Sequence, residues 1–459
     1  MRGRFLYYFL WGQAPWCLTP HFDTIRNMKD IQIEKLIQAE KIRQKKVINL
    51  IASENIVSKD VLEALGSELT NKYAEGYPGK RYYGGNEVVD KIELLAQERA
   101  LKLFGLNKEE WSVNVQPLSG SPANLAVYLA LVPAGAKIMG MSLSHGGHLT
   151  HGHKVSATGK FWKQVPYGVD EETEVINYEA IKNIATQEMP EIIVCGFTAY
   201  PRTVDFKKFR EITDASSKLR KKLGLSETIL MCDMSHFAGL VAGKQYPSPF
   251  EYADVVTTTV HKTLRGPRSA MIFSRNDKIV KGKDTIVGGN KNGVGGKIVK
   301  GKDQTFGELI DKAVFPGLQG GPHMNQIAAV AVALKEAGTP EFKKYALQVK
   351  KNAKVLADEL QKLGWHVISG GTDSHLVLID VWMQGIKNEL GAGAITGADT
   401  SDKLEKAGII VNKNTIPKEG RSAFDPSGIR LGSAAETTRG KVEKDFVNIA
   451  KKIDKVLRS

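Results

Sequence analysis

The sequence predicts an α/β protein with a doubly wound, mostly parallel sheet and a second, smaller α/β domain towards the C-terminus. Three observations lead to this prediction. Short β-branched and apolar runs recur along the chain, the intervals between them are long enough for helices, and 459 residues are enough for two or more domains. The composition, 42% hydrophobic and 25% charged, is that of a soluble globular protein.

Four apolar runs are expected to form strands of the large sheet. They are "KIMGMSL" (137–143), "EIIVCGF" (191–197), "TILMCDM" (228–234) and "DVVTTTV" (254–260). Because each is separated from the next by enough chain for a helix, parallel crossovers are expected. Nearer the C-terminus, a helix around 341–363 precedes "WHVISGGTDSHLVLIDV", which is expected to form two strands about a Gly-Gly turn.

The expected domain boundaries follow changes in composition. Residues 1–27 are an aromatic-rich extension without a small-residue cleavage site, so we expect a translation extension or a disordered arm, with Met28 as the natural start. Residues 28–60 open with an amphipathic helix and form an N-terminal arm. Residues 61–334 are expected to form the large domain and residues 335–459 the small one.

One internal repeat interrupts the large domain. "KIVKGKD" occurs at 278–284 and again at 297–303, separated by "TIVGGNKNGVGG". A two-stranded ribbon with a glycine-rich tip, or a disordered duplicated insert, accounts for this basic segment at 276–304. Its role is left open.

The net charge of +14 suggests nucleic acid, but its distribution argues against it. Residues 276–304 carry seven lysines against three aspartates, a net of +4, and residues 1–27 contribute +2, so the rest is spread over the chain. No basic module interleaved with aromatic residues is present. No apolar stretch is long enough for a membrane helix.

The cysteines Cys17, Cys195 and Cys232 are far apart in the sequence and fit neither a disulfide framework nor a zinc site. A reducing compartment, the cytoplasm, is therefore expected.

Lys262 lies directly after the fourth expected strand, in "DVVTTTVHKTLRGPR". Open α/β sheets bind ligands at the carboxyl ends of their strands. Two interpretations remain open from these residues alone: a solvated lysine, or an amine nucleophile that forms a Schiff base. The nucleophile needs a lowered pKa, which burial and the neighbouring His261, Arg265 and Arg268 would help to provide.

Other stretches supply what a bound aromatic aldehyde phosphate would need. In "QPLSGSPAN", Ser119, Gly120 and Ser121 precede a helical run and would either hold a phosphate or simply cap the helix. In "LMCDMSHFAG", Asp233 ends a strand and would either keep a pyridine nitrogen protonated or cap a helix; His236 follows three residues later.

Three further candidates come from single stretches. "SLSHGGHLTHGH" holds four histidines in a glycine-broken loop, for which metal binding and ring stacking are both open, although no acidic or cysteine ligand completes a metal site. Arg430 in "PSGIRLGS" is a candidate clamp for a carboxylate. Glu75 lies among four tyrosines in "NKYAEGYPGKRYYGG" and is a candidate proton donor and acceptor.

Taken in order, these stretches resemble serine hydroxymethyltransferases, pyridoxal-phosphate enzymes of the aspartate-aminotransferase-like fold. The likeness runs from about Met28 to the C-terminus and rests on "LIASEN", "NKYAEGYPGKRYYGG", "HGGHLTHG", "TTTVHKTLRGPR", "FPGLQGGP" and "SGIRLG". It implies fold type I, with a mostly parallel seven-stranded sheet in the large domain and a smaller C-terminal α/β domain. It also implies reversible transfer of the hydroxymethyl carbon of L-serine to tetrahydrofolate, giving glycine and 5,10-methylenetetrahydrofolate.

The resemblance assigns roles by position. The implied catalytic residues are Lys262, Glu75, His236 and Tyr83, with Lys262 covalently attached to pyridoxal phosphate. The implied cofactor-binding residues are Ser119, Gly120, Ser121, His148, Thr198, Asp233, His236, His261, Lys262 and Gly321. The implied amino-acid contacts are Ser53, Tyr83, Arg430 and Glu75. The implied folate contacts are Tyr82, Leu143, Gly147, Leu149 and Asn414. Arg268 is an implied support, and no metal is implied.

In the family, Ser53, Glu75, Tyr83 and Gly321 serve a partner subunit's site, so a homodimer with shared sites is expected; whether it pairs into a tetramer stays open. Thr198 stands where many members carry serine, which keeps the hydroxyl. Two rival functions are a folate-independent threonine or 3-hydroxy-amino-acid aldolase on the same fold, and a basic RNA-binding protein that kept the fold. The folate-facing "YYGG" and "NKN" (412–414) disfavour the aldolase as the main role.

Overall fold

The computed structural model describes residues 28–282, 285–287, 297–299, 301–382, 385–386 and 394–459. The chain divides into two units, residues 1–47 and residues 48–459. The described part of the first unit contains one helix, α1 (Ile31–Lys46). Asp30 caps it, because its carboxylate accepts hydrogen bonds from the backbone N–H groups of Gln32 and Ile33 at 3.1 Å each. The expected helix is therefore present, although none of its residues is buried.

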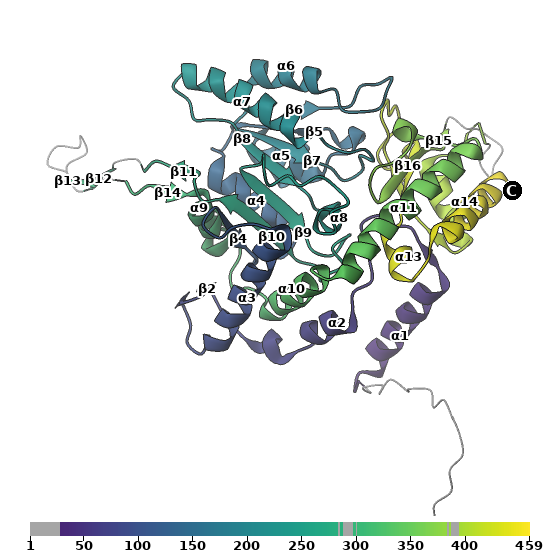
Figure 1. Cartoon of the computed structure of the whole chain (residues 1–459), viewed down its shortest axis with the longest axis horizontal. Coiled ribbons are helices and arrows are strands. Elements are labelled where there is room, and N and C mark those ends of the chain that lie inside the picture. The colour runs from purple at the N-terminus through teal and green to yellow at the C-terminus, as the bar shows by residue number, and fades with distance from the viewer. Residues whose placement is uncertain (1–27, 283–284, 288–296, 300, 383–384, 387–393) are drawn as a thin grey trace, which may run out of the picture. The chain divides into compact units, whose positions relative to one another are not determined.

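The second unit is built on a seven-stranded sheet (Figure 1). Its strands lie in the order β4-β10-β9-β8-β7-β5-β6. Their bounds are β4 (Trp111–Asn114), β5 (Lys137–Met141), β6 (Lys163–Tyr167), β7 (Ile192–Gly196), β8 (Ile229–Asp233), β9 (Val255–Thr259) and β10 (Ala270–Arg275). Only β10 runs against its neighbours β9 and β4; the other pairs are parallel. The predicted fold class and the four expected strands, β5, β7, β8 and β9, are confirmed.

Helices cover both faces of this sheet, as a doubly wound fold requires. Alternate residues of each strand enter different cores because strand side chains point to opposite faces. In β8, Leu230 packs into one hydrophobic cluster and Met231 into the other. One face is covered by α4 (Gly120–Leu131) and α9 (Phe306–Lys312), and the other by helices that include α3 (Glu87–Phe104), α7 (Phe206–Lys222), α8 (Ala238–Ala242) and α10 (Met324–Ala337).

The C-terminal region carries its own sheet, in the order β15-β16-β19-β18. The bounds are β15 (His366–Val367), β16 (Leu376–Asp380), β18 (Asn412–Asn414) and β19 (Gly428–Gly432). The long helices α11 (Pro340–Lys362) and α14 (Glu443–Arg458) pack a separate hydrophobic cluster against it, with Leu356 and Phe446 fully buried. The expected helix around 341–363 and the two strands that follow it are confirmed. The boundary between residues 334 and 335 stays a prediction.

The duplicated basic segment forms a ribbon over its described residues. β12 (Thr285–Val287) pairs antiparallel with β13 (Lys297–Val299), and β11 (Ile279–Val280) pairs with β14 (Gln304–Thr305) at its base. The ribbon alternative is thus confirmed, while the expected glycine-rich tip at 288–296 lies outside the described residues. Among the helices that the structure describes, none has the length and apolarity that a bilayer crossing demands.

The remaining elements connect these layers. They are β1 (Ile48–Asn49), α2 (Lys59–Leu65), β2 (Gly76–Tyr77), β3 (Lys80–Arg81), α5 (Ala157–Phe161), α6 (Tyr178–Glu188), α12 (Gly397–Lys406), β17 (Ile409–Ile410) and α13 (Ala434–Thr438). β1 pairs in parallel with β17, which attaches the start of the second unit to the C-terminal region.

Candidate active site

Lys262 lies three residues beyond the carboxyl end of β9, in the loop that returns the chain to β10, and is only 8% exposed. The pKa of its amine is lowered to about 8: burial is the largest cause, Asp233 opposes it, and the charges of Arg430 and Arg268 act with it. A solvated strand-end lysine would keep its ordinary pKa. The structure therefore removes the solvated alternative and leaves an amine that is partly neutral near pH 8.

Asp233, the last residue of β8, provides a buried carboxylate close to this amine. Its Oδ2 accepts hydrogen bonds from Asn124 Nδ2 at 2.9 Å and His151 Nε2 at 3.1 Å, and its Oδ1 accepts from the N–H of Ser235 at 3.0 Å. Burial raises the pKa of Asp233, but the hydrogen bond from His151 and the favourable electrostatics of the neighbouring His151, His148 and Lys262 outweigh it, so the pKa lies well below its usual range. Asp233 is therefore an ionised acceptor inside the protein.

In the loop after β5, residues 142–153 and here called the histidine loop, hydrogen bonds determine which ring nitrogens are protonated. His151 Nδ1 accepts a hydrogen bond from the backbone N–H of His148 at 3.2 Å. The proton of the His151 ring is therefore on Nε2, which donates the hydrogen bond to Asp233. His148 Nδ1 accepts from the N–H of Thr150 at 3.2 Å, and burial lowers the His148 pKa to about 4. His148 is thus neutral. In the described ranges, no group of three or more His, Cys, Asp or Glu side chains is arranged so that it could hold a metal ion.

The N-terminus of α4 lies against the end of β9. Ser119 is the N-cap residue, yet its side chain makes no capping hydrogen bond, so the plain helix-cap interpretation does not apply to it. At Gly120 a Cβ would lie 2.8 Å from Cγ2 of Thr259. The first N–H groups of a helix have no partner within the helix and favour anions. The arrangement of Ser119, Gly120 and Ser121 suits a phosphate.

A second buried histidine pair adjoins these groups. His236 Nδ1 lies 3.2 Å from His375 Nε2, and the two rings stack with centroids 5.4 Å apart. Burial lowers the pKa of His375 to about 3 and that of His236 well below its ordinary value, and the charge of Lys262 contributes to both. Sequence reasoning found His236 but missed His375, whose only signal was a histidine directly before the apolar run of β16.

Arg430 in β19 is a buried guanidinium without a carboxylate partner in the described residues. Its Nε donates to Asn412 Oδ1 at 3.0 Å and its Nη1 to the carbonyl of Thr198 at 2.8 Å. Burial lowers its pKa to about 10, so it stays charged at neutral pH. A buried cation that is oriented but not neutralised is what a substrate carboxylate requires.

Glu75 belongs to a separate group around Tyr73. The Tyr73 hydroxyl donates to Glu75 Oε1 at 3.1 Å, and the Tyr73 ring packs edge-on against Tyr83 with centroids 5.1 Å apart. A Cβ at Gly321 would lie 3.2 Å from the Tyr73 ring. Within the described chain, no hydrogen bond, ion pair or ring contact joins Glu75, Tyr83 or Gly321 directly to Lys262, Asp233 or Arg430.

The expected folate contacts divide between these places. Leu143, Gly147 and Leu149 lie in the histidine loop, and the Leu143 carbonyl accepts from the hydroxyl of Thr415, the residue after Asn414, at 3.4 Å. Tyr82, in contrast, is 82% exposed and packs edge-to-face against Tyr83 in the Tyr73 group.

Three other expected residues stay close to the lysine group. Burial and the charges of Lys262 and Arg268 lower the pKa of the half-buried His261 to about 3, and Arg268 is exposed. Ser53 follows Ala52, which packs against Gly432 two residues after Arg430. Ser53 is therefore near β19, the strand that carries Arg430.

Sequence comparison agrees with this geometry. A sequence model of the family described as serine hydroxymethyltransferase matches residues 26–453. A curated serine hydroxymethyltransferase of Desulfotalea psychrophila (strain LSv54 / DSM 12343) is 49% identical over 436 residues, which cover 95% of this chain and 90% of that protein. The predicted family, fold class and transferase activity are confirmed. The chain belongs to the serine hydroxymethyltransferase family.

Proposed function

We propose that this protein transfers the hydroxymethyl carbon of L-serine reversibly to tetrahydrofolate and that the reaction takes place at the group around Lys262. The location is supported by a buried lysine, with a pKa lowered to about 8, and a buried carboxylate near the carboxyl ends of β9 and β8. Arg430 of the C-terminal sheet adds a buried guanidinium that no described carboxylate neutralises and that hydrogen-bonds to the loop after β7. These are the groups needed to bind an aldehyde, a protonated ring nitrogen and an amino-acid carboxylate.

The residues at this edge fit pyridoxal phosphate. Lys262 would hold its aldehyde carbon covalently, the N-terminus of α4 from Ser119 to Ser121 would hold its phosphate, and Asp233 would accept a hydrogen bond from its ring nitrogen. The fit rests on the small Gly120 beside Thr259 and on the ionised, buried state of Asp233. When bound, this cofactor supplies an electron sink for the amino acid's α-carbon.

His148 and His236 would lie along the cofactor's ring and oxygen, and Thr198 and His261 would complete its surroundings. Both imidazoles are neutral because burial lowers their pKa values. Neutral rings suit stacking and hydrogen bonding, and they do not compete with Lys262 or Arg430 for an anionic ligand. Arg268, outside the pocket, would help to keep the Lys262 amine neutral.

Arg430 would bind the serine carboxylate. Two of its nitrogens are already held, by Asn412 and by the Thr198 carbonyl, and no described residue hydrogen-bonds its Nη2. The side chain is therefore oriented before substrate arrives, which reduces the entropy lost on binding. Ser53, which follows Ala52 beside Gly432, would support the same carboxylate.

Glu75 would hold and move the proton of the serine hydroxyl, with Tyr83 beside the amino acid, as part of a partner subunit's site. The support is that no hydrogen bond, ion pair or ring contact joins Glu75 or Tyr83 to Lys262 within the described chain, together with the exposure of Tyr83, which is 45%. A homodimer in which each chain lends Glu75, Tyr83 and Gly321 would complete two sites. Tyr82, Leu143, Gly147, Leu149 and Asn414 would face tetrahydrofolate.

We also propose a cytoplasmic location, which the two described cysteines, Cys195 and Cys232, support by being buried and unpaired.

The test of the activity is glycine formation from serine by the purified, cofactor-loaded protein, with and without tetrahydrofolate. Formation that requires tetrahydrofolate is expected, as is its loss in Lys262→Ala. Cleavage of threonine or serine at the same rate without tetrahydrofolate would instead identify an aldolase. Salt-dependent RNA retention by a protein without cofactor absorbance would contradict both enzyme functions.

A further inference from the structure

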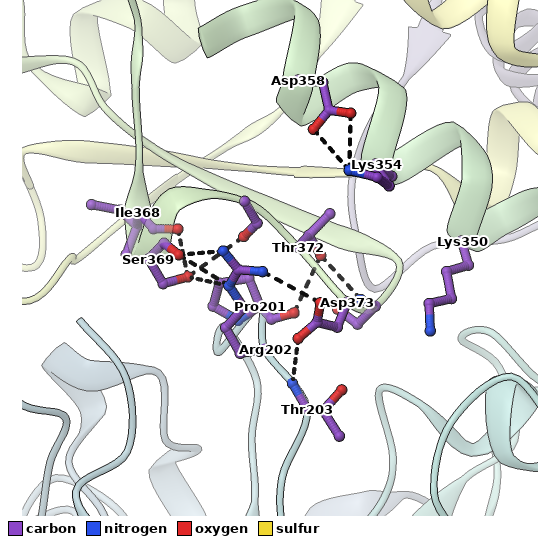
Figure 2. Close-up of polar contacts among 12 residues, drawn as sticks. Pro201, Arg202, Thr203, Lys350, Lys354, Asp358, Ile368, Ser369, Thr372 and Asp373 are labelled. Carbon is purple, nitrogen blue, oxygen red and sulfur yellow. Dashed lines mark hydrogen bonds and ion pairs between the residues drawn. The ribbon is translucent and has the colours of Figure 1, made fainter. Parts of the chain in front are cut away.

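Two loops that flank the proposed site are fastened together by one arginine (Figure 2). Residues 201–203 follow β7, and residues 369–373 precede β16. Arg202 Nε donates to the Ser369 carbonyl at 3.0 Å, its Nη2 donates to the same carbonyl, and its Nη1 donates to Asp373 Oδ1 at 3.3 Å.

Backbone contacts complete the junction. The N–H of Thr203 donates to the other carboxylate oxygen of Asp373 at 3.0 Å, and the N–H of Asp373 donates to the Pro201 carbonyl at 3.0 Å. The hydroxyl of Thr372 donates to that carbonyl at 3.2 Å. The arginine fork and these bonds hold two segments that lie far apart in the sequence.

The loop held by Arg202 has a conformation that needs support. Ser369, Gly370 and Gly371 have consecutive positive φ angles of 59°, 65° and 139°. A serine in the left-handed region costs free energy, and such residues persist only where their surroundings hold them. Besides Arg202, only Glu174 hydrogen-bonds with Ser369 from another part of the described chain: its carboxylate accepts a hydrogen bond from the backbone N–H of Ser369 at 2.6 Å.

Both loops lead directly to groups of the proposed site. Thr198, whose carbonyl accepts from Arg430, lies three residues before Pro201. His375, which contacts His236, lies two residues after Asp373. The carbonyl of His375 in turn accepts from the N–H of Ser433, next to β19. A shift between the loops would therefore alter what Arg430 and His375 contact.

We propose that Arg202 is a positioning residue for the amino-acid substrate: it fastens the loop after β7 to the loop before β16, so that the Thr198 carbonyl orients Arg430 and His375 stays against His236. The proposal deepens the proposed function and rests on it. Arg202 itself hydrogen-bonds to Ser369, Asp373 and Tyr246, none of which is proposed to hold substrate or cofactor.

The cavity beside Arg202 provides a control for the loss of a positive charge. Arg202 borders a cavity of about 390 Å³ that α11 lines with lysines, among them Lys350 and Lys354. Lys354 pairs with Asp358 at 3.0 Å and Lys350 donates to the Gln245 carbonyl at 3.3 Å, so neither contacts the two loops (Figure 2). Lys354→Met is therefore a matched control: it removes a cation from the same cavity but none of the loop-to-loop bonds.

The experiment compares cofactor-loaded wild type, Arg202→Met, Arg202→Lys and Lys354→Met. We expect Arg202→Met to raise the KM for serine by about 10- to 100-fold, because small displacements of a positioning group have effects of that order. Its cofactor Kd should stay within about twofold, because the α4 terminus, Asp233 and Lys262 are not part of the junction. The KM for serine of Arg202→Lys should lie between those of wild type and Arg202→Met, because a lysine keeps the charge but cannot donate two parallel hydrogen bonds as a guanidinium does. Lys354→Met should match wild type.

Hydrogen exchange gives a readout independent of turnover. Peptides spanning 370–378 and 428–434 should exchange faster in Arg202→Met than in wild type or Lys354→Met. If these peptides exchanged at the wild-type rate in Arg202→Met, the claim that Arg202 fastens the two loops together would be wrong, whether or not the protein is active. An active wild type with an unchanged serine KM in Arg202→Met would overturn the positioning role, as would equal losses of serine and cofactor binding. An inactive wild type would instead refute the proposed function.

Discussion

Lys262 shows how a single ionisation depends on its surroundings. Moving its pKa from 10.5 to about 8 disfavours the ammonium by about 3 kcal/mol. Burial is the main cause, and Arg430 and Arg268 add to it, while Asp233 opposes both. The same carboxylate that would hold the cofactor ring thus keeps the amine from becoming still less basic. Burial therefore disfavours the ammonium form of Lys262 and favours the neutral amine, which is the form that can attach covalently to an aldehyde.

This balance predicts a pH profile for the cofactor-free protein. Only the neutral amine reacts with an acylating reagent, so acetylation of Lys262 by acetic anhydride should rise with pH and reach half its maximum near pH 8, against about 10.4 for an ordinary lysine. Arg268→Met should move the midpoint to higher pH because it removes a positive charge that disfavours the ammonium. Asp233→Asn should move it to lower pH.

Mass spectrometry of the Lys262 peptide measures each rate, with exposed lysines of the same protein as internal standards. A midpoint close to that of the exposed lysines would refute the burial argument. A downward shift in Arg268→Met would refute the electrostatic one.

At the scale of elements, the contact between α4 and β9 decides how closely a phosphate can be held. Gly120 opens α4, and a Cβ there would lie 2.8 Å from Cγ2 of Thr259. Gly120→Ala should therefore displace the helix terminus from the strand. We expect a loss of about 1–3 kcal/mol in the free energy of unfolding, the usual cost of overpacking, and a weaker affinity for pyridoxal phosphate.

The clash is with a methyl group, which gives the prediction an internal control. Thr259→Ser removes that methyl but keeps the hydroxyl that donates to the Ser235 carbonyl. The double variant Gly120→Ala/Thr259→Ser should recover most of the stability and cofactor affinity lost in Gly120→Ala, as urea unfolding and cofactor titration would measure. Strict additivity of the two changes would show that the methyl is not the obstacle.

The elements that could be predicted from the sequence are those whose pattern is local. β5, β7, β8 and β9 are buried apolar runs, and such runs identify central strands. β6 was missed because it contains Pro166, which is tolerated there because β6 is an edge strand. β4 was missed as well, since its four residues are too short to show a pattern.

The candidate site divides in the same way. Charged residues are unusual inside buried apolar strands or at their ends. This is why Lys262, Asp233 and Arg430 could be identified from the sequence. Asn124, His151 and His375 could not be assigned because their contacts join segments far apart in the sequence: Asn124 reaches Asp233 over 109 positions, and His375 reaches His236 over 139. Periodicity carries no information about such contacts. The resemblance to the family supplied the roles that the local pattern left open.

The Tyr73 group, made up of Tyr73, Glu75, Tyr82, Tyr83 and Gly321, exposes large aromatic side chains on the surface of one chain. Tyr82 is 82% exposed and Tyr83 is 45% exposed, although both are large aromatic side chains beside a proposed catalytic carboxylate. Exposed aromatic clusters of this kind are typical of surfaces that bind another protein. The expected partner is a second copy of this chain.

This arrangement predicts complementation between two inactive variants. In a heterodimer of Lys262→Ala and Glu75→Gln chains, a site shared across the dimer would combine an intact Lys262 from one chain with an intact Glu75 from the other. Random pairing makes half of the dimers mixed, each with one complete site of two, so co-expressed chains should recover about one quarter of wild-type activity. Each variant alone, and the two mixed after purification without subunit exchange, are the controls. If Glu75 served its own chain, every site in the mixed dimer would lack one of the two residues, and co-expression would restore nothing.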